Sequence, residues 1–142
     1  MPEESLEGQV RRICWADLAT VDQGAAKLFY CQLFGWTAQD RRAGKGHFST
    51  FSSRETPFAS LYQLSHKQIE HGVPSHWTPY VSVPNLDVAA SMAASLGGQV
   101  VIPPHDSGGL ARISLIADPT GALIGLWQTA RETSGQHPYR DP

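Results

Sequence analysis

The chain has 142 residues, of which 41% are hydrophobic, and a formal net charge of −2. These values are typical of one globular domain that needs neither a disulfide nor a structural zinc to fold. Acidic and basic residues are interspersed, which argues against a nucleic-acid-binding stripe and against a polybasic membrane patch. No apolar run reaches the roughly 20 residues that a membrane-spanning helix requires.

The amino terminus and the cysteines indicate a cytoplasmic protein. The first nine residues, MPEESLEGQ, are acidic and polar, which is the opposite of a secretory signal peptide. Cys14 falls in a predicted strand and Cys31 in a predicted helix, and neither has the spacing of a metal motif. We expect both to be buried apolar residues in a reducing compartment.

The first half of the chain predicts a strand followed by an amphipathic helix. The strand covers residues 10–20, and Asp22 is a typical N-cap for the helix that ends at Gly35. The helix face expected to pack on a sheet has two adjacent apolar rows, Ala25, Phe29 and Leu33 beside Ala26, Tyr30 and Phe34.

The second half repeats this pattern. Asn85 and Gly98 stand where Asp22 and Gly35 stand in the first half, and each pair is 13 residues apart. The offset between the halves is therefore 63 residues, since 85 − 22 = 63. The second helix has one apolar row, formed by Val88, Met92 and Leu96.

The other segments are predicted as strands, turns and loops. Turns or loops are expected at 40–46, at the polar connection 65–75 and at 103–109, and the polar tail 129–142 is expected to be loose. The remaining strands are expected at residues 36–39, 47–52, 58–64, 77–83, 99–102, 110–117 and 122–128.

Each half therefore has the order βαβββ within a single domain covering residues 1–142. Module 1 covers about residues 10–64 and module 2 about residues 77–128. Because one module has a helix on only one face of its sheet, two modules together can bury the helix faces and enclose a space. The predicted fold class is α+β, with two modules forming a curved mixed sheet around a cup and helices on the outer face.

This pattern resembles the vicinal oxygen chelate superfamily, which includes glyoxalase I, extradiol dioxygenases and bleomycin-resistance proteins. The resemblance covers about residues 10–128. Its motifs are Asp22, Phe29-Tyr30 and Leu33-Phe34-Gly35-Trp36 in module 1, and Val83 to Gly98 and Asp118-Pro119-Thr120-Gly121 in module 2. The chain is also similar to a subgroup with further motifs at Cys14-Trp15, Asp17-Leu18, His76-Trp77 and Pro79-Tyr80.

The resemblance also implies where a metal would bind. Metal-dependent members hold one divalent ion through four inward-pointing side chains, usually His, Gln or Glu. The corresponding positions here are Trp15, Tyr62, Thr78 and Gly125. Indole cannot ligate, glycine has no side chain, and neutral Thr and Tyr are poor ligands for hard cations. We therefore expect neither the family's metal nor another cofactor.

The leading functional prediction is a pocket that binds a small organic molecule. Alternation along the strands places Asp17 and four aromatic residues on the cup face. The predicted ligand-binding residues are Trp15, Asp17, Tyr62, Thr78, Tyr80 and Trp127. The resemblance to bleomycin-resistance proteins implies binding without a reaction, and a homodimer.

Two alternatives remain open. The protein could be an enzyme of the lyase, isomerase or dioxygenase type, with Asp17 as a general base or with a non-standard metal site. That metal site would be built on His47, His76 or His105. Alternatively, Asp17 pairs with Arg112, the cup is filled by its own side chains, and the protein mediates only assembly.

Overall fold

The computed structural model describes residues 11–129 except 44–45, 108 and 110. The chain divides into two compact units, residues 15–78 and residues 1–14 with 79–142. These units correspond to modules 1 and 2 and keep those names below. The acidic amino terminus and most of the predicted loose tail lie outside the described residues.

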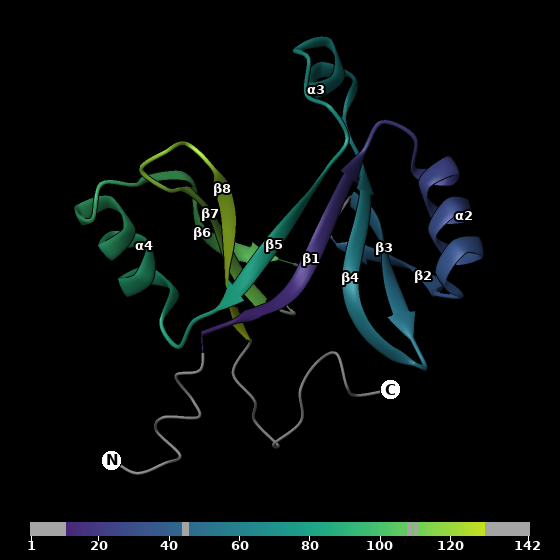
Figure 1. Ribbon diagram of the computed structural model, residues 1–142, viewed down its shortest axis with the longest axis horizontal. Helices are drawn as coiled ribbons and strands as arrows, with labels where there is room; N and C mark the ends of the chain where they lie inside the picture. The colour runs from purple at the N-terminus through teal and green to yellow at the C-terminus, as the bar shows by residue number, and fades with distance from the viewer. Residues whose placement is uncertain (1–10, 44–45, 108, 110, 130–142) are drawn as a thin grey trace. The chain divides into compact units, whose positions relative to one another are not determined.

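Module 1 has the predicted βαβββ order (Figure 1). Its strands lie in the order β2-β3-β4-β1, with β1 parallel to β4 and the other neighbours antiparallel. The elements are β1 (Ile13–Thr20), α2 (Gln23–Phe34), β2 (Thr37–Ala43), β3 (Gly46–Ser53) and β4 (Thr56–Gln63).

The ends of α2 are set by local sequence. Asp22 Oδ1 accepts the backbone N–H of Ala25 at 3.0 Å, which caps the first turn. Gly35 has a φ of 74° and donates its N–H to the Cys31 carbonyl at 2.9 Å. Glycine adopts this left-handed conformation without steric cost, so the helix ends where the sequence predicts.

Only part of the predicted apolar surface of α2 packs on the sheet. Ala26 and Tyr30 contact the module 1 core, whereas Phe29 and Leu33 are 56% and 58% exposed. The prediction that both rows face the sheet is therefore wrong, because the two rows together are wider than the contact with one sheet face. The buried core consists of Leu18, Phe51, Ala59 and Leu61.

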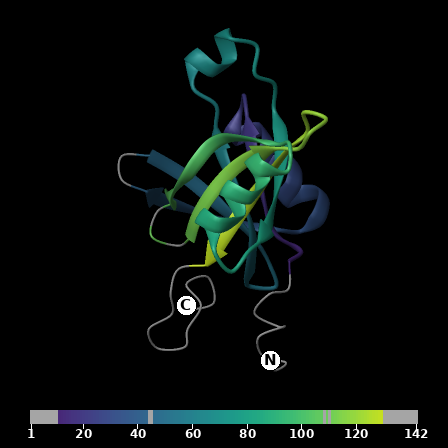
Figure 2. The same cartoon turned by 90° about the vertical axis from the view of Figure 1, so that its left-hand side faces the viewer.

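Module 2 has the same order of elements, and Figure 2 shows α4 lying over its sheet. The strand order is β5-β8-β7-β6, with β5 parallel to β8. The elements are β5 (His76–Ser82), α4 (Leu86–Ser95), β6 (Gln99–Ser107), β7 (Ala111–Ala117) and β8 (Leu123–Thr129). The α+β class and the two βαβββ modules predicted from the sequence are confirmed.

The buried side of α4 differs from the predicted one. Leu86 and Ala90 are buried against Val83 and Leu126. Because residues four apart share one side of a helix, the docking of Leu86 in the first turn also turns Ala90 inward. The row expected to be buried is largely exposed, at 58% for Val88, 55% for Met92 and 72% for Leu96.

Three segments predicted as turns or loops have regular structure. β2 extends to Ala43 because it pairs with β3 along its whole length. β6 continues through the predicted loop at 103–109 as far as Ser107, with register shifts that accommodate its prolines. The connection after β4 contains α3 (His66–Glu70), which begins with a capping box between Ser65 and Gln68.

The cysteines are less buried than predicted. Cys14 is exposed and Cys31 is intermediate. Cys14 lies at the beginning of β1 beside Ile13, which is 62% exposed. In the described part of the chain, no helix has the length and apolar character needed to cross a membrane.

Candidate functional site

A row of polar side chains crosses the face of module 1 that lies away from α2. In the strand ladder Gln39 is opposite Thr50, Thr50 is opposite Ser60, and Ser60 is opposite Asp17. Residues opposite one another in neighbouring strands project to the same side of a sheet. These four residues, called the polar row below, therefore share one face, while their strand neighbours such as Leu18 face α2.

Two aromatic rings flank the Asp17 end of the polar row. Trp15 lies two residues before Asp17, is buried, and donates its indole N–H to Ser60 Oγ at 2.7 Å. Tyr62 lies two residues after Ser60 on the same face of β4. The structure thus brings together the predicted residues Trp15, Asp17 and Tyr62, and adds Ser60.

The charge of Asp17 affects the neighbouring phenol. Burial, together with the nearby Asp17 carboxylate, raises the pKa of Tyr62 above its ordinary value. Asp17 Oδ1 is itself shielded from solvent. Tyr62 therefore keeps its proton at neutral pH and is a hydrogen-bond donor beside an acceptor.

The other end of the polar row carries a guanidinium group. Arg41 donates Nε–H to Thr50 Oγ1 at 3.1 Å and an Nη2 proton to Gln39 Oε1 at 3.4 Å. Thr50 is fully buried. The row therefore offers donors at the Arg41 end and a carboxylate at the Asp17 end.

The corresponding face of module 2 is apolar. Tyr80 is opposite Gly125, Gly125 is opposite Leu115, and Leu115 is opposite Ile102. The rings of Tyr80 and Trp127 lie edge to face, with centroids 6.1 Å apart and planes at 76°. The two copies of the βαβββ unit thus present chemically different faces.

Gly125 must be a glycine in this arrangement. A Cβ added there would lie 2.2 to 2.7 Å from three carbon atoms of the Tyr80 ring. The ring therefore occupies the space that a side chain at this position would need.

Strand pairing also shifts the correspondence between the last strands of the modules. Asp17 is opposite Ser60, and Tyr80, which lies 63 residues after Asp17, is opposite Gly125. Gly125 therefore corresponds to Ser60, and not to Tyr62 as the constant sequence offset implied. Two residues shift because the offset is 63 in the first strand and 65 in the last, since 125 − 60 = 65.

The residues at the family's metal positions do not fit a divalent cation. Trp15 is a hydrogen-bond donor to Ser60, Thr78 is a buried neutral hydroxyl, and Gly125 lies beneath the Tyr80 ring. Within residues 11–129, apart from the four omitted positions, no three His, Cys, Asp or Glu side chains are grouped so that they could hold a metal.

The candidate histidines make local contacts. His76 Nδ1 donates to the Pro74 carbonyl at 2.8 Å, and His105 Nδ1 donates to the Pro103 carbonyl at 2.9 Å. His47 is an exposed residue of β3. These contacts orient two of the rings toward their own backbone, and none of the three histidines belongs to a metal-binding group among the described residues.

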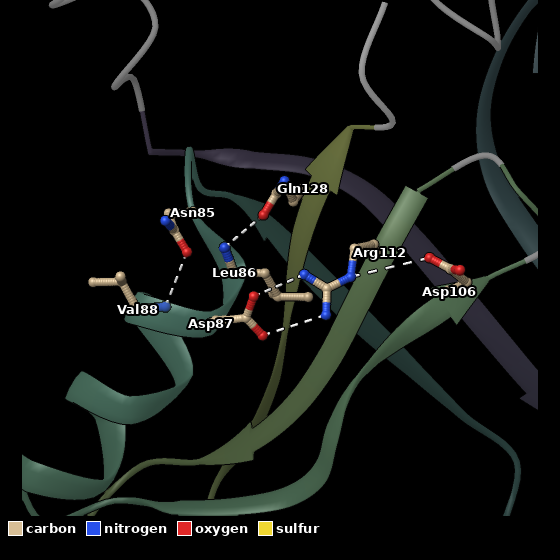
Figure 3. A network of polar contacts seen from close by, with 7 residues as sticks. All are labelled: Asn85, Leu86, Asp87, Val88, Asp106, Arg112 and Gln128. Carbon is tan, nitrogen blue, oxygen red and sulfur yellow. Dashed lines mark hydrogen bonds and ion pairs between the residues drawn. The ribbon is translucent and has the colours of Figure 1, made fainter.

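Arg112 pairs with α4 and β6 rather than with Asp17 (Figure 3). Its guanidinium donates to both oxygens of Asp87, at 2.9 and 3.3 Å, and lies 4.0 Å from Asp106. The hydrogen bonds from Arg112 hold the pKa of Asp87 below its ordinary value. The predicted Asp17–Arg112 pair is therefore wrong, because the fold places an acidic helix residue within reach of Arg112.

A surface depression of about 410 Å³ lies on α4. It is lined by Asp87, Val88, Ser91 and Met92, all from this one helix. Tyr80 and Trp127 alternate with residues that face α4, so they lie on the other side of the sheet. The depression is therefore separate from the predicted ligand-binding residues.

Sequence reasoning missed the other members of the polar row and Arg41. Ser60 was within reach, because it alternates with Tyr62 on β4 and so shares its face. Gln39 and Thr50 required the pairing of β2 with β3 and of β3 with β4, which residue periodicity within one strand does not specify.

Comparison with protein families matches the chain to one model. The model of the Glyoxalase/Bleomycin resistance protein/Dioxygenase superfamily matches residues 12–126.

Two curated relatives are similar over most of the chain. CFP32 of Mycobacterium bovis, a protein named as a glyoxylase, is 40% identical over 119 residues, which are 82% of this chain and 45% of that protein. The anthracycline biosynthesis protein DnrV of Streptomyces peucetius is 35% identical over 127 residues, 80% of this chain and 46% of that protein. The chain thus spans about half the length of these relatives.

Solved structures share the fold at low sequence identity. The hypothetical protein BH1468 from Bacillus halodurans has a TM-score of 0.69 at 12% identity, covering 89% of this chain and 100% of that one. Methylmalonyl-CoA epimerase from Mycobacterium tuberculosis has a TM-score of 0.64 at 16% identity, covering 87% and 91%. At such identities the likeness is one of fold alone.

Proposed function

This chain belongs to the Glyoxalase/Bleomycin resistance protein/Dioxygenase superfamily, and we propose that it binds a flat, oxygen-bearing organic molecule in the cytoplasm. The proposed site is the module 1 face that carries Trp15, Asp17 and Tyr62. The observation that supports it is a polar row across four strands, flanked at one end by two aromatic rings. Binding requires no metal or cofactor in this proposal.

The chemistry of the face favours a planar ligand with polar groups along one edge. Aromatic pairs contribute about 0.5–1.5 kcal/mol beyond their buried area, and a few polar groups fix a ligand's orientation. Asp17 accepts a ligand hydroxyl proton, while Tyr62 donates to a ligand carbonyl. Polycyclic hydroxyquinones combine these features, and the name of one relative, which refers to anthracycline biosynthesis, supports this class.

Three further residues enter the proposal in different roles. Thr78 is a buried hydroxyl of module 1 that would orient the ligand. Tyr80 and Trp127 form an edge-to-face pair in module 2, and their part in binding is tested by separate variants.

The test is a fluorescence titration with two probes, a fluorescent anthracycline and 1,8-dihydroxyanthraquinone. Trp15→Ala and Tyr62→Phe should each weaken binding, the first by about tenfold or more, equivalent to 1.4 kcal/mol. Trp77→Ala is the matched control, since Trp77 hydrogen-bonds Tyr30 on the α2 side of the sheet. Unchanged affinity in Trp15→Ala would show that the site is elsewhere, and failure of both probes to bind the wild type would refute the ligand class.

A second candidate function is catalysis with Asp17 as a general base. The shielding of Asp17 Oδ1 beside Tyr62 favours it, because enzymes place proton-transfer groups in such surroundings. Asp17→Asn separates the two functions. A catalytic role predicts loss of turnover with binding retained, whereas a binding role predicts weaker binding and no turnover in the wild type.

A further inference from the structure

The surface of α2 and the adjoining β5 carries an exposed aromatic face, defined here as Phe29, Tyr30, Leu33, Phe34 and Trp77. Four of these residues are strongly exposed, at 56% for Phe29, 58% for Leu33, 55% for Phe34 and 37% for Trp77. Tyr30 lies between them and also contacts the module 1 core.

The rings of this face are in mutual contact. The Tyr30 ring centroid is 5.0 Å from that of Phe29, 5.4 Å from that of Trp77 and 6.2 Å from that of Phe34. Trp77 also donates its indole N–H to the Tyr30 hydroxyl at 3.1 Å. Leu33 is one helical turn from Phe29, so the face is continuous and held in place.

The size of the aromatic face calls for a partner. Its exposed apolar area is roughly 400 Å², which is comparable to the largest patch on a typical monomer, a patch that is often functional. It supplies about half of the roughly 800 Å² that each partner contributes to a stable interface. The module 1 core does not use this area, because that core lies on the sheet side of α2.

The charge pattern indicates what kind of partner fits. Lys27 is the one charged residue of α2, and its ammonium group is paired with Asp40 at 3.0 Å. The helix has no acidic residue in its first turn and no basic residue in its last. The helix therefore has no spare charge with which to select a charged partner, and an apolar face is well complemented by an identical one.

The lengths of the relatives agree with a second unit. The matched part is 45% of CFP32 and 46% of DnrV, so each relative has room for another segment of similar length. A chain that spans about half of such a protein can supply the second unit by binding a copy of itself. We propose that the aromatic face docks a second copy of this chain, with α2 against α2 in a two-fold symmetric dimer.

Sedimentation equilibrium of the full chain over a concentration series tests this dimer. The wild type should be in reversible monomer–dimer equilibrium. Phe29→Glu should raise the dimer dissociation constant by about 100-fold or more, because it puts a charge in the centre of an apolar interface. Leu33→Ser is a milder second variant, and circular dichroism with thermal melting verifies that each variant folds.

Leu28→Glu is the matched control. Leu28 is 59% exposed on the same helix but lies about 100° around the axis from Phe29, outside the aromatic face. It should leave the dissociation constant unchanged. A wild type that stays monomeric at every concentration overturns the proposal, as does equal weakening by Leu28→Glu and Phe29→Glu. A monomer that co-sediments with phosphatidylglycerol vesicles would assign the face to a membrane surface instead.

Discussion

Tyr80 covers the position where this fold family carries its last metal ligand, and the side chain missing from Gly125 makes that possible. In Gly125→Ala the new Cβ would overlap the Tyr80 ring, with its nearest carbon at 2.2 Å. We expect a loss of about 1–3 kcal/mol in the free energy of unfolding, the usual cost of overpacking, measured by urea denaturation.

Two variants make this prediction specific. Gly24→Ala is the control, because its Cβ would meet only Asp22 Oδ1 at 3.7 Å and alanine favours a helix. Adding Tyr80→Ala to Gly125→Ala should remove part of the cost, which a double-mutant cycle records as a coupling energy. Two changes that simply add would mean that the ring and the new methyl group do not meet.

The pKa of Tyr62 reports on the Asp17 end of the polar row. Burial and the Asp17 carboxylate raise it, so Asp17→Asn should bring it closer to the ordinary value. Ultraviolet titration of tyrosinate measures the change, and Tyr62→Phe identifies the signal. A Tyr62 transition that does not move in Asp17→Asn would remove the carboxylate as a cause.

The same shift affects stability at high pH. Because the folded pKa of Tyr62 is raised, the folded state holds a proton that the unfolded state loses above the ordinary tyrosine value of about 10. This stabilisation is complete below that value and is lost as pH rises through the folded pKa. Tyr62→Phe should therefore unfold less steeply with rising pH than the wild type does.

Among the elements, α4 depends on contacts at its first turn (Figure 3). Asn85 Oδ1 accepts the Val88 N–H at 3.1 Å, and Gln128 of β8 accepts the Leu86 N–H at 2.7 Å. Asn85→Ala should cost about 1 kcal/mol of unfolding free energy by urea denaturation, while Asn85→Asp should retain most of it. Equal losses in the two variants would mean that the cap is not the cause.

The ion pair between α4 and β7 predicts a response to acid. Hydrogen bonds from Arg112 lower the folded pKa of Asp87, so the pair stabilises the fold above the ordinary aspartate value of about 3.9. That contribution is lost as pH falls below this value through the folded pKa. Both groups lie at the surface, so solvent keeps the effect small.

Urea midpoints measured from neutral pH to acid test this pair. Asp87→Asn should lower the midpoint at neutral pH and flatten its fall in acid. Asp106→Asn is the control, because that carboxylate lies 4.0 Å from Arg112 and forms no hydrogen bond with it among the described contacts. A steeper acid response in Asp106→Asn than in Asp87→Asn would contradict the assignment.

For the molecule as a whole, ligand binding should be visible as stability. A ligand that binds only the folded state adds about 2.7 kcal/mol at a concentration of 100 times its dissociation constant. Either quinone probe should therefore raise the melting temperature of the wild type and not that of Trp15→Ala. No increase with any member of a broad ligand panel would favour a protein that serves only in assembly.

What the sequence by itself determined is the set of local features. Asp22, Asn85 and Gly35 placed the helix ends, and the 63-residue repeat predicted two βαβββ modules, because caps and periodicity depend on neighbours in the chain. The turn at Asp118 likewise follows from its own side chain, which accepts the backbone N–H groups of Thr120 and Ala122.

Tertiary structure decided which surfaces meet. Phe29 is apolar and at helical spacing, yet it is exposed because Ala26 and Tyr30 take the sheet contact. The Trp15–Ser60 hydrogen bond and the Arg112–Asp87 pair join residues 45 and 25 positions apart. Such partners depend on strand register and helix placement, which no local pattern encodes, and the same register places the polar row on one face of module 1.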